Sequence, residues 1–161
     1  TRNAAPVIPG VLKIAPIKSY GIYRERALLY SRETDPHGLQ QHRYHYWIDT
    51  PTRLIRDQLI EFLRASGVAG GIAGSQASLS GDLRLKLTLK QLERVIHTDR
   101  QVSVKVALDA LIATADGRTL KITGYTHETA ATDASIPASV SAIDQTLNRI
   151  YFEILGDLQT L

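Results

Sequence analysis

The stretch LRLKLTLKQLERVI, residues 83–96, decides the fold. Four leucines alternate with polar residues over its first half: Leu83, Leu85, Leu87 and Leu89. Alternation with a period of two is typical of a β-strand that buries one face and exposes the other to water. The alternation slips at Gln91 and Leu92, which predicts a β-bulge at that point.

The residues that follow this stretch predict two further strands. The segment HTDR, residues 97–100, has the composition of a turn, and apolar residues then alternate from Val102 to Ile112. Asp116 and Gly117 form a dipeptide typical of tight hairpins, and an extended segment resumes at Leu120. We therefore expect three long antiparallel strands.

Two amphipathic patterns predict helices. The first begins at Thr50, a capping residue, with Pro51 at the first helical position, and it ends at Gly67. The second pattern spaces apolar residues by three and four positions between residues 136 and 158: Ile136, Val140, Ile143, Leu147, Ile150 and Ile154. A broad apolar stripe of this kind favours packing on a sheet over pairing in a coiled coil.

The N-terminal half completes the predicted sheet. Residues 1–9 have the composition of a loosely ordered lead-in, and residues 11–17, 26–33 and 41–48 predict three strands of a meander, with a turn at residues 34–38. The small residues 68–74 are consistent with a thin strand, and residues 75–81 with a loop. We expect an α+β fold in one domain, residues 1–161, with an antiparallel or mixed β-sheet and two amphipathic helices packed on one face.

Composition excludes several classes of protein. The chain has no cysteine, which excludes disulfides and thiolate chemistry, and no apolar run approaches the roughly 20 residues of a membrane span. Nineteen basic and sixteen acidic residues are interspersed, so nucleic-acid binding is not indicated. The absence of methionine indicates that an N-terminal piece precedes Thr1, and a signal peptide or lipid anchor is expected there.

Catalytic and metal-binding motifs are not found. No HExxH, GxGxxG or GxSxG pattern occurs, and His42 and His45 are three apart on a predicted strand, so they point to opposite faces. Asp57 and Glu61 lie on a predicted helix face together with Arg53 and Arg64, which favours a solvated, ion-paired surface over acid and base catalysis. We therefore predict no enzyme activity, no metal and no cofactor.

The stretch YHYWIDTPTRLIRDQLIEFL, residues 44–63, resembles the hallmark of the ABC-type transport auxiliary lipoproteins. In this motif an extended aromatic segment containing Tyr46 leads to Trp47, a short acidic step, Pro51 and an amphipathic helix. The segments 11–33 and 83–94 and the final helix are also similar to that family, so the resemblance covers nearly all of residues 11–158. The family's lipidated N-terminal cysteine is not in this chain.

The resemblance implies a function. Members of the family are tethered by lipid on the periplasmic side of the outer membrane, and they are not known as enzymes. They work with an inner-membrane ABC permease and ATPase and with an MCE-type substrate-binding protein in moving lipids between membranes. Trp47 and Pro51 are then structural residues that set the entry of the helix. The competing interpretations from the residues alone are a small hydrolase and a basic nucleic-acid-binding module.

Self-association is a further expectation. If both helices cover one face of the sheet, Arg84, Lys86 and Lys90 face outward and suit a wet contact between copies. Tyr44, near an unpaired strand edge, is a candidate aromatic anchor for the same contact. The alternative is a monomer whose polar sheet face meets water.

Overall fold

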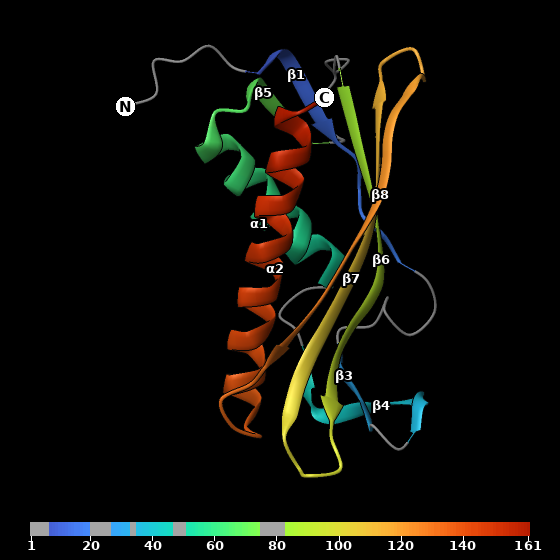
Figure 1. Ribbon diagram of the computed structural model, residues 1–161, viewed down its shortest axis with the longest axis vertical. Coiled ribbons are helices and arrows are strands. Elements are labelled where there is room, and N and C mark those ends of the chain that lie inside the picture. Colours follow the sequence, from blue (N-terminus) through green and yellow to red (C-terminus); the bar gives the residue numbers. More distant parts are fainter. Residues whose placement is uncertain (1–6, 20–26, 33–34, 47–50, 75–82) are drawn as a thin grey trace.

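A long central strand, β6 (Leu83–Ile96), organises a structure in which two helices cover one face of a twisted sheet (Figure 1). The computed structural model describes residues 7–19, 27–32, 35–46, 51–74 and 83–161, and within residues 27–46 it describes the backbone. The sheet contains parallel and antiparallel pairs. This confirms the α+β fold with a mixed sheet.

The three long antiparallel strands are confirmed. The strand β7 (Val102–Thr114) pairs along the whole of β6, and β8 (Thr119–Ala130) pairs along β7. The register shifts between Leu89 and Gln91, where the alternation of the sequence slips. The two turns use backbone conformations with positive φ, 68° at Arg100 and 94° at Gly117.

The N-terminal strands lie along the opposite edge of β6. The strands β1 (Ile8–Ile14), β2 (Lys18–Ser19) and β3 (Ala27–Arg32) pair with β6 one after another, and all three pairs are parallel. The strand β5 (Ala69–Gly74) is parallel to β1, whereas β4 (Asp35–Tyr46) is antiparallel to β3. The predicted meander is therefore right for the β3–β4 pair and wrong for β1, which pairs with β5 and β6 instead. A period of two reports which face is buried and does not report which strand is the partner.

The turn predicted at residues 34–38 is also wrong, because β4 already begins at Asp35. Pro36 and Gly38 therefore lie within a strand. In the path of paired strands, β4 is the end strand beyond β3. Proline is tolerated in an edge strand because its missing N–H is not needed for a second ladder.

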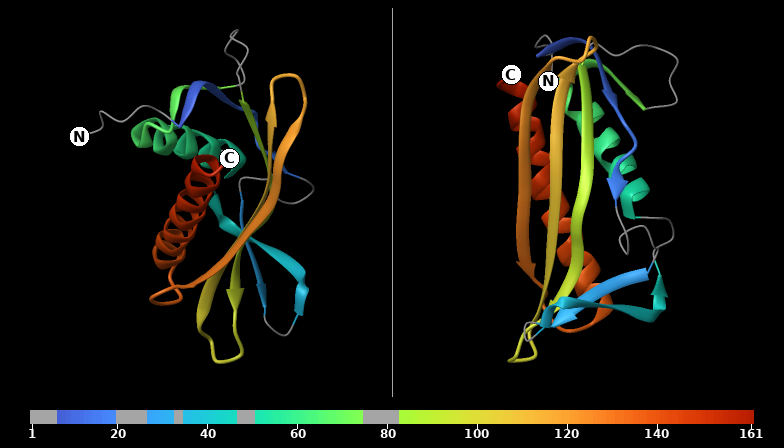
Figure 2. Two further views of the ribbon diagram at one scale, coloured as in Figure 1. Left: turned by 45° about the horizontal axis from the view of Figure 1, so that its top comes forward. Right: turned by 90° about the vertical axis from the view of Figure 1, so that its right-hand side faces the viewer.

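Both predicted helices are confirmed and lie on the same face of the sheet (Figure 2). The helix α1 (Pro51–Ser66) is followed by Gly67, whose φ of 68° suits glycine. The helix α2 (Ile136–Gln159) begins after Ser135, whose Oγ accepts a hydrogen bond from the backbone N–H of Ala138 at 3.2 Å. Thr50, the predicted cap of α1, lies outside the described residues.

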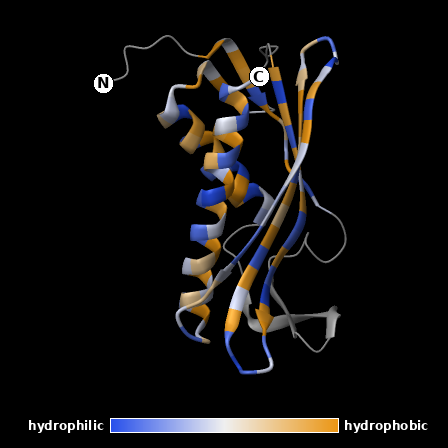
Figure 3. Ribbon diagram, viewed as in Figure 1, coloured by the Kyte–Doolittle hydropathy of each residue, from blue (hydrophilic) through white to orange (hydrophobic). Residues whose placement is uncertain are grey.

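The core lies between the helices and the sheet, where apolar side chains of both layers pack together. Figure 3 shows hydrophobic residues recurring along the helices and the long strands. The alternate leucines of β6 and the apolar stripes of α1 and α2 supply most of it: Leu85, Leu87, Leu89, Ile55, Leu59, Leu63, Ile143, Ile150 and Ile154 are buried. One polar side chain also spans the layers, because Arg56 of α1 donates from Nη2 to the carbonyl of Ile14 at 3.3 Å. Its Nη2 lies 2.7 Å from the place that a Cβ at Gly74 would take, so a larger residue there would have to displace the end of this arginine side chain.

Candidate functional site

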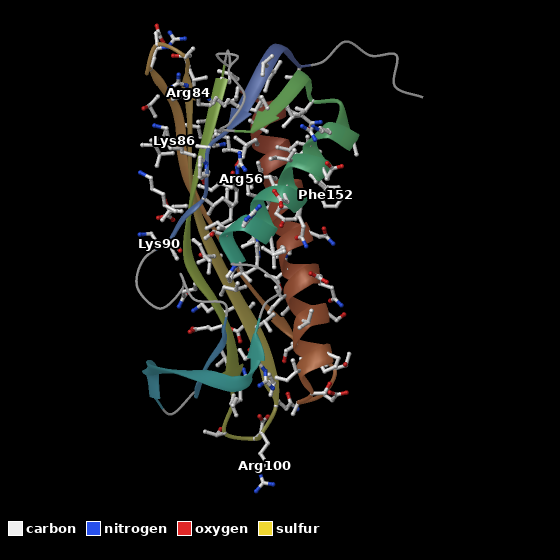
Figure 4. All side chains as sticks on the ribbon, turned by 180° about the vertical axis from the view of Figure 1, so that it is seen from behind. Arg56, Arg84, Lys86, Lys90, Arg100 and Phe152 are labelled. Atoms are coloured by element: carbon white, nitrogen blue, oxygen red, sulfur yellow. The ribbon has the colours of Figure 1, made fainter. Side chains whose placement is uncertain are left out.

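The basic residues predicted to face outward lie in a row on the sheet face that the helices do not cover (Figure 4). We call this face the outer sheet face. Lys86 and Lys90 are exposed and Arg84 is half-buried. Lys90 lies 3.8 Å from Asp109 of β7, and Ile122 of β8 is 71% exposed. The outer sheet face therefore offers basic groups beside an exposed apolar side chain, and its part in contacts between copies stays a prediction.

The residues of the aromatic motif are placed only in part. Tyr44 and Tyr46 belong to the end of β4, and Trp47 lies outside the described residues. Pro51 is buried and is the first residue of α1, the position where proline needs no hydrogen-bond donor. The structural role proposed for Trp47 and Pro51 stays a prediction.

A serine, a histidine and a glutamate meet at one end of the β6–β7–β8 ribbon, which the sequence did not reveal. The Ser103 hydroxyl donates to Oε2 of Glu128 at 2.5 Å, and Nε2 of His97 lies 2.9 Å from the same hydroxyl oxygen. Because the hydroxyl proton goes to the carboxylate, the imidazole is the donor to Ser103. A serine nucleophile needs the opposite arrangement, in which the imidazole accepts the proton.

The surroundings of this cluster also argue against catalysis. Ser103 is only 5% exposed, so a substrate has little access to its oxygen. The contacts join β7 to β8 and to the turn after β6, which is a structural role. Among the described residues, no three histidine, aspartate or glutamate side chains come together in a way that could hold a metal ion.

A second polar cluster fixes α2 to β8. Asp157 of α2 accepts hydrogen bonds from Nζ of Lys121 at 2.8 Å and from the Tyr125 hydroxyl at 2.5 Å. One turn earlier, Glu153 contacts Nε2 of His127. Sequence periodicity could not find these contacts, because they depend on where α2 lies across the sheet.

The electrostatics of this cluster follow from its partial burial. Burial alone raises the pKa of the Asp157 carboxyl, but the hydrogen bonds from Lys121 and Tyr125 and the Lys121 charge outweigh it, so the pKa is lowered from 3.8. The pKa of Tyr125 is raised by burial and by the neighbouring carboxylates. At neutral pH the cluster is therefore an ionised carboxylate held by one cation and one neutral hydroxyl.

An open concave surface lies between α1 and α2, on the side away from the sheet. We call it the helix groove. It consists of two adjoining depressions of about 500 and 470 Å³ that share Phe62. One is lined by carboxylates from both helices, including Asp57, Glu61 and Asp144, and the other by Phe152 and Leu155. Both are open to solvent, so the groove suits a ligand laid along it better than an enclosed small molecule.

Contacts between the helices fix the floor of the helix groove. Tyr151 is buried, and its hydroxyl lies 2.9 Å from Oε1 of Gln58, to which it donates. The ring of Phe62 packs on Tyr151 with centroids 5.7 Å apart and meets the edge of Phe152 at 5.0 Å. Phe152 itself is 64% exposed and points away from the sheet (Figure 4).

Neither of the two described helices has the length and apolar composition needed to cross a membrane. The structure is an α+β protein with an open groove on its helix layer. Several solved structures of other proteins have a similar fold. Protein XCC0632 from Xanthomonas campestris superposes with a TM-score of 0.84 at 18% identity, over 96% of this chain and 86% of that chain.

Two further solved structures have the same fold. An uncharacterized protein matches with a TM-score of 0.74 at 13% identity, over 96% of this chain and 95% of that chain. The hypothetical protein CT253 from Chlamydia trachomatis matches with a TM-score of 0.56 at 7% identity, over 94% and 96% of the two chains. At these identities the likeness concerns the fold alone.

The family of this chain is shown by its sequence, not by the structural likeness. Residues 3–154 match the family of ABC-type transport auxiliary lipoprotein components, and the chain belongs to that family. None of the curated proteins compared matches the chain. The resemblance first suggested by the aromatic motif is therefore confirmed over most of the chain.

Proposed function

We propose that the protein is a non-enzymatic periplasmic subunit of an ABC transport system that moves lipids between membranes. In this proposal an N-terminal lipid anchors it to the outer membrane, and it works with an MCE-type substrate-binding protein and an inner-membrane ABC permease and ATPase. The observation that carries the proposal is the family match over residues 3–154. The proposal treats residues 1–161 as one domain.

The geometry of the described residues supports a binding role over a catalytic one. Ser103, where the serine, histidine and glutamate meet, is buried, and its hydrogen bonds run in the wrong direction for nucleophilic attack. The concave surface that is open to a ligand lies elsewhere, between α1 and α2. A subunit that positions other proteins needs such a surface and needs no reactive group.

Self-association is part of the proposal. The outer sheet face has exposed Lys86 and Lys90 and exposed Ile122, so a contact through it would be polar and hydrated, like the rim of an interface. A lipid-tethered subunit gains avidity from repeated weak contacts, because linked sites raise the effective concentration. Tyr44 is an additional candidate at the edge of β4.

The anchor and the partners can be tested together by expressing the native gene, including the codons upstream of Thr1, with a C-terminal tag. We expect a signal peptide that ends before a cysteine, incorporation of radiolabelled palmitate, and sedimentation with outer membranes. Mutation of that cysteine should release the protein from the membrane while leaving it folded. The proposal is wrong in its anchoring if the upstream codons encode no such cysteine.

The partners are tested by crosslinking in cells followed by purification through the tag. We expect an MCE-domain protein to co-purify, and an unrelated tagged lipoprotein serves as the control. The alternative of a nucleic-acid-binding module predicts instead that the purified protein binds oligonucleotides with an affinity that falls steeply with salt. Oligonucleotide binding without any transporter component would overturn the proposed function.

A further inference from the structure

The helix groove exposes an aromatic ring to solvent. Phe152 is 64% exposed, whereas the adjacent Tyr151 is buried at 2%. The Phe62 ring touches both, so the three rings run as one aromatic cluster from the core to the surface. Aromatic side chains, phenylalanine among them, are enriched at protein interfaces relative to the rest of the surface.

The shape of the helix groove suits an elongated ligand. Its two depressions, about 500 and 470 Å³, lie on either side of Phe62 and between the same two helices. A third helix laid over two others packs its side-chain ridge into the furrow between them. The groove therefore has the form used in helix-in-groove recognition.

The rim of the helix groove carries carboxylates, which favour a ligand with positive charge. Asp57 and Glu61 of α1 face Asp144 of α2 across one depression. Glu61 pairs with Arg64 at 3.3 Å, but no hydrogen bond or ion pair joins Asp57 or Asp144 to another described residue. Burial raises the pKa of Asp144, as expected for a carboxylate that has lost water without gaining a cation. Lysine or arginine side chains would complete this rim.

We propose that the helix groove binds a helical segment of a partner protein that carries apolar side chains on one face and lysine or arginine beside them. This inference rests on the proposed function, in which the protein positions other transporter subunits. The apolar face of the segment covers Phe152 and Leu155, and its basic residues meet Asp57 and Asp144. Burying Phe152 removes apolar area from water, and the ion pairs fix the direction of the segment.

Other occupants fit less well. An anionic lipid headgroup or a nucleic acid is repelled by the carboxylates of the rim, and an acyl chain needs an enclosed cavity, whereas both depressions are open. A second copy could offer its outer sheet face, which has the right charge at Lys86 and Lys90. A sheet face is a broad twisted surface without the single ridge that a groove accepts.

The test uses purified protein and two synthetic helical peptides of about 14 residues, long enough to span roughly 21 Å. One peptide is built from leucine and lysine with helical amphipathic spacing, and the other replaces every lysine by glutamate. Binding is measured by fluorescence anisotropy at low salt. The chain has a net charge of +3, so overall charge alone would favour the acidic peptide. A preference for the basic peptide would therefore show that the carboxylates at the rim of the helix groove determine binding.

Two matched pairs of variants locate the binding. Phe152→Gln should weaken binding of the basic peptide by about tenfold, whereas Ile122→Thr, at an equally exposed apolar position of the outer sheet face, should leave it unchanged. Removing two rim charges by Asp57→Asn with Asp144→Asn should weaken binding several-fold at low salt. The control with the same change in net charge is Asp99→Asn with Asp109→Asn.

The outcomes decide the proposal. It is overturned if the acidic or a scrambled peptide binds as well as the basic one, or if the control variants weaken binding as much as the groove variants. Sedimentation of the same proteins provides the second readout. If Phe152→Gln abolishes self-association and the basic peptide does not bind, the occupant is a second copy and the proposal is wrong. Membrane anchoring and co-purification with transporter subunits are independent of this result, so failure of the groove is distinguishable from failure of the proposed function.

Discussion

Replacing Asp157 by alanine tests how α2 is held against the edge of the sheet. Asp157 accepts hydrogen bonds from Tyr125 at 2.5 Å and from Lys121 at 2.8 Å. Without the carboxylate, the hydroxyl of Tyr125, a residue only 4% exposed, loses its acceptor, which costs about 1–3 kcal/mol of stability. The Lys121 side chain is 37% exposed, so its ion pair is screened by water and adds at most about 1 kcal/mol.

We therefore expect Asp157→Ala to lower the free energy of unfolding by about 2 kcal/mol, and to lower the melting temperature by about 4–8 °C for a chain of this size. The assay is urea denaturation followed by circular dichroism for the wild type, Asp157→Ala, Tyr125→Phe and the double variant. The hydrogen bond predicts a coupling energy of about 1 kcal/mol in this cycle. Additive effects of the two single substitutions would refute the reasoning.

The stability contributed by Asp157 also depends on pH with a definite sign. Its pKa is lowered from 3.8 in the folded protein, so the unfolded chain takes up a proton at higher pH than the folded one. The contribution is therefore fully present above the unfolded value and is lost as pH falls through the folded value. The difference in stability between the wild type and Asp157→Ala should shrink as pH is lowered from about 6 to about 3. A difference that does not change over this range would contradict the assigned ionisation.

Arg94 is 4% exposed and donates to Ser139 Oγ at 2.8 Å and to the carbonyl of Ala134 at 2.7 Å. In urea denaturation, Arg94→Ala should therefore lower the free energy of unfolding by about 3 kcal/mol. The control Arg100→Ala, at an exposed position, should change it by less than about 0.5 kcal/mol. Gly156→Ala should raise stability by about 0.5–1 kcal/mol, because the position is helical and a Cβ there meets no atom within 4 Å; Gly67→Ala, at a φ of 68°, should lower it by about 1 kcal/mol. If copies associate through the outer sheet face, sedimentation velocity should show a mass that rises with concentration above 17.8 kDa, and Lys86→Glu should reduce the rise; a constant mass would remove self-association from the proposal.

The parts of the fold that were predictable are those fixed by local patterns. The alternation in β6, the hairpin at Gly117 and the apolar stripe of α2 each depend on residues close in sequence, and each predicted its element. The pairing of β1, β2 and β3 with β6 was not predictable, because a strand's side-chain pattern is the same for any partner. The sequence also does not show which strand will lie at the edge of the sheet. Pro36 therefore predicted a turn, although it lies within the edge strand β4.

Of the candidate functional surfaces, only the outer sheet face could be predicted from the sequence. The outward direction of Lys86 and Lys90 follows from alternation alone. The helix groove depends on how α2 crosses α1, and its rim unites Asp57 and Glu61 with Asp144 from a distant part of the chain. The sequence did place Asp57 and Glu61 on a solvated face of α1. It had no signal for the carboxylate that completes the rim.

The pairing of three N-terminal strands with one edge of β6 has a consequence for the order of folding. Leu12 pairs with Leu83, and Leu29 pairs with Glu93, so these strands have no such partner until the second half of the chain is available. The β6–β7–β8 ribbon and α2 are connected by short turns and can form first, because local contacts cost less loop entropy. In pulse-labelling hydrogen exchange during refolding, amides of β7 should gain protection before those of β1, and simultaneous protection would contradict this order. Until β6 is available, the first half can form only the β3–β4 and β1–β5 pairs, and the strand edges that later join β6 stay open to other contacts.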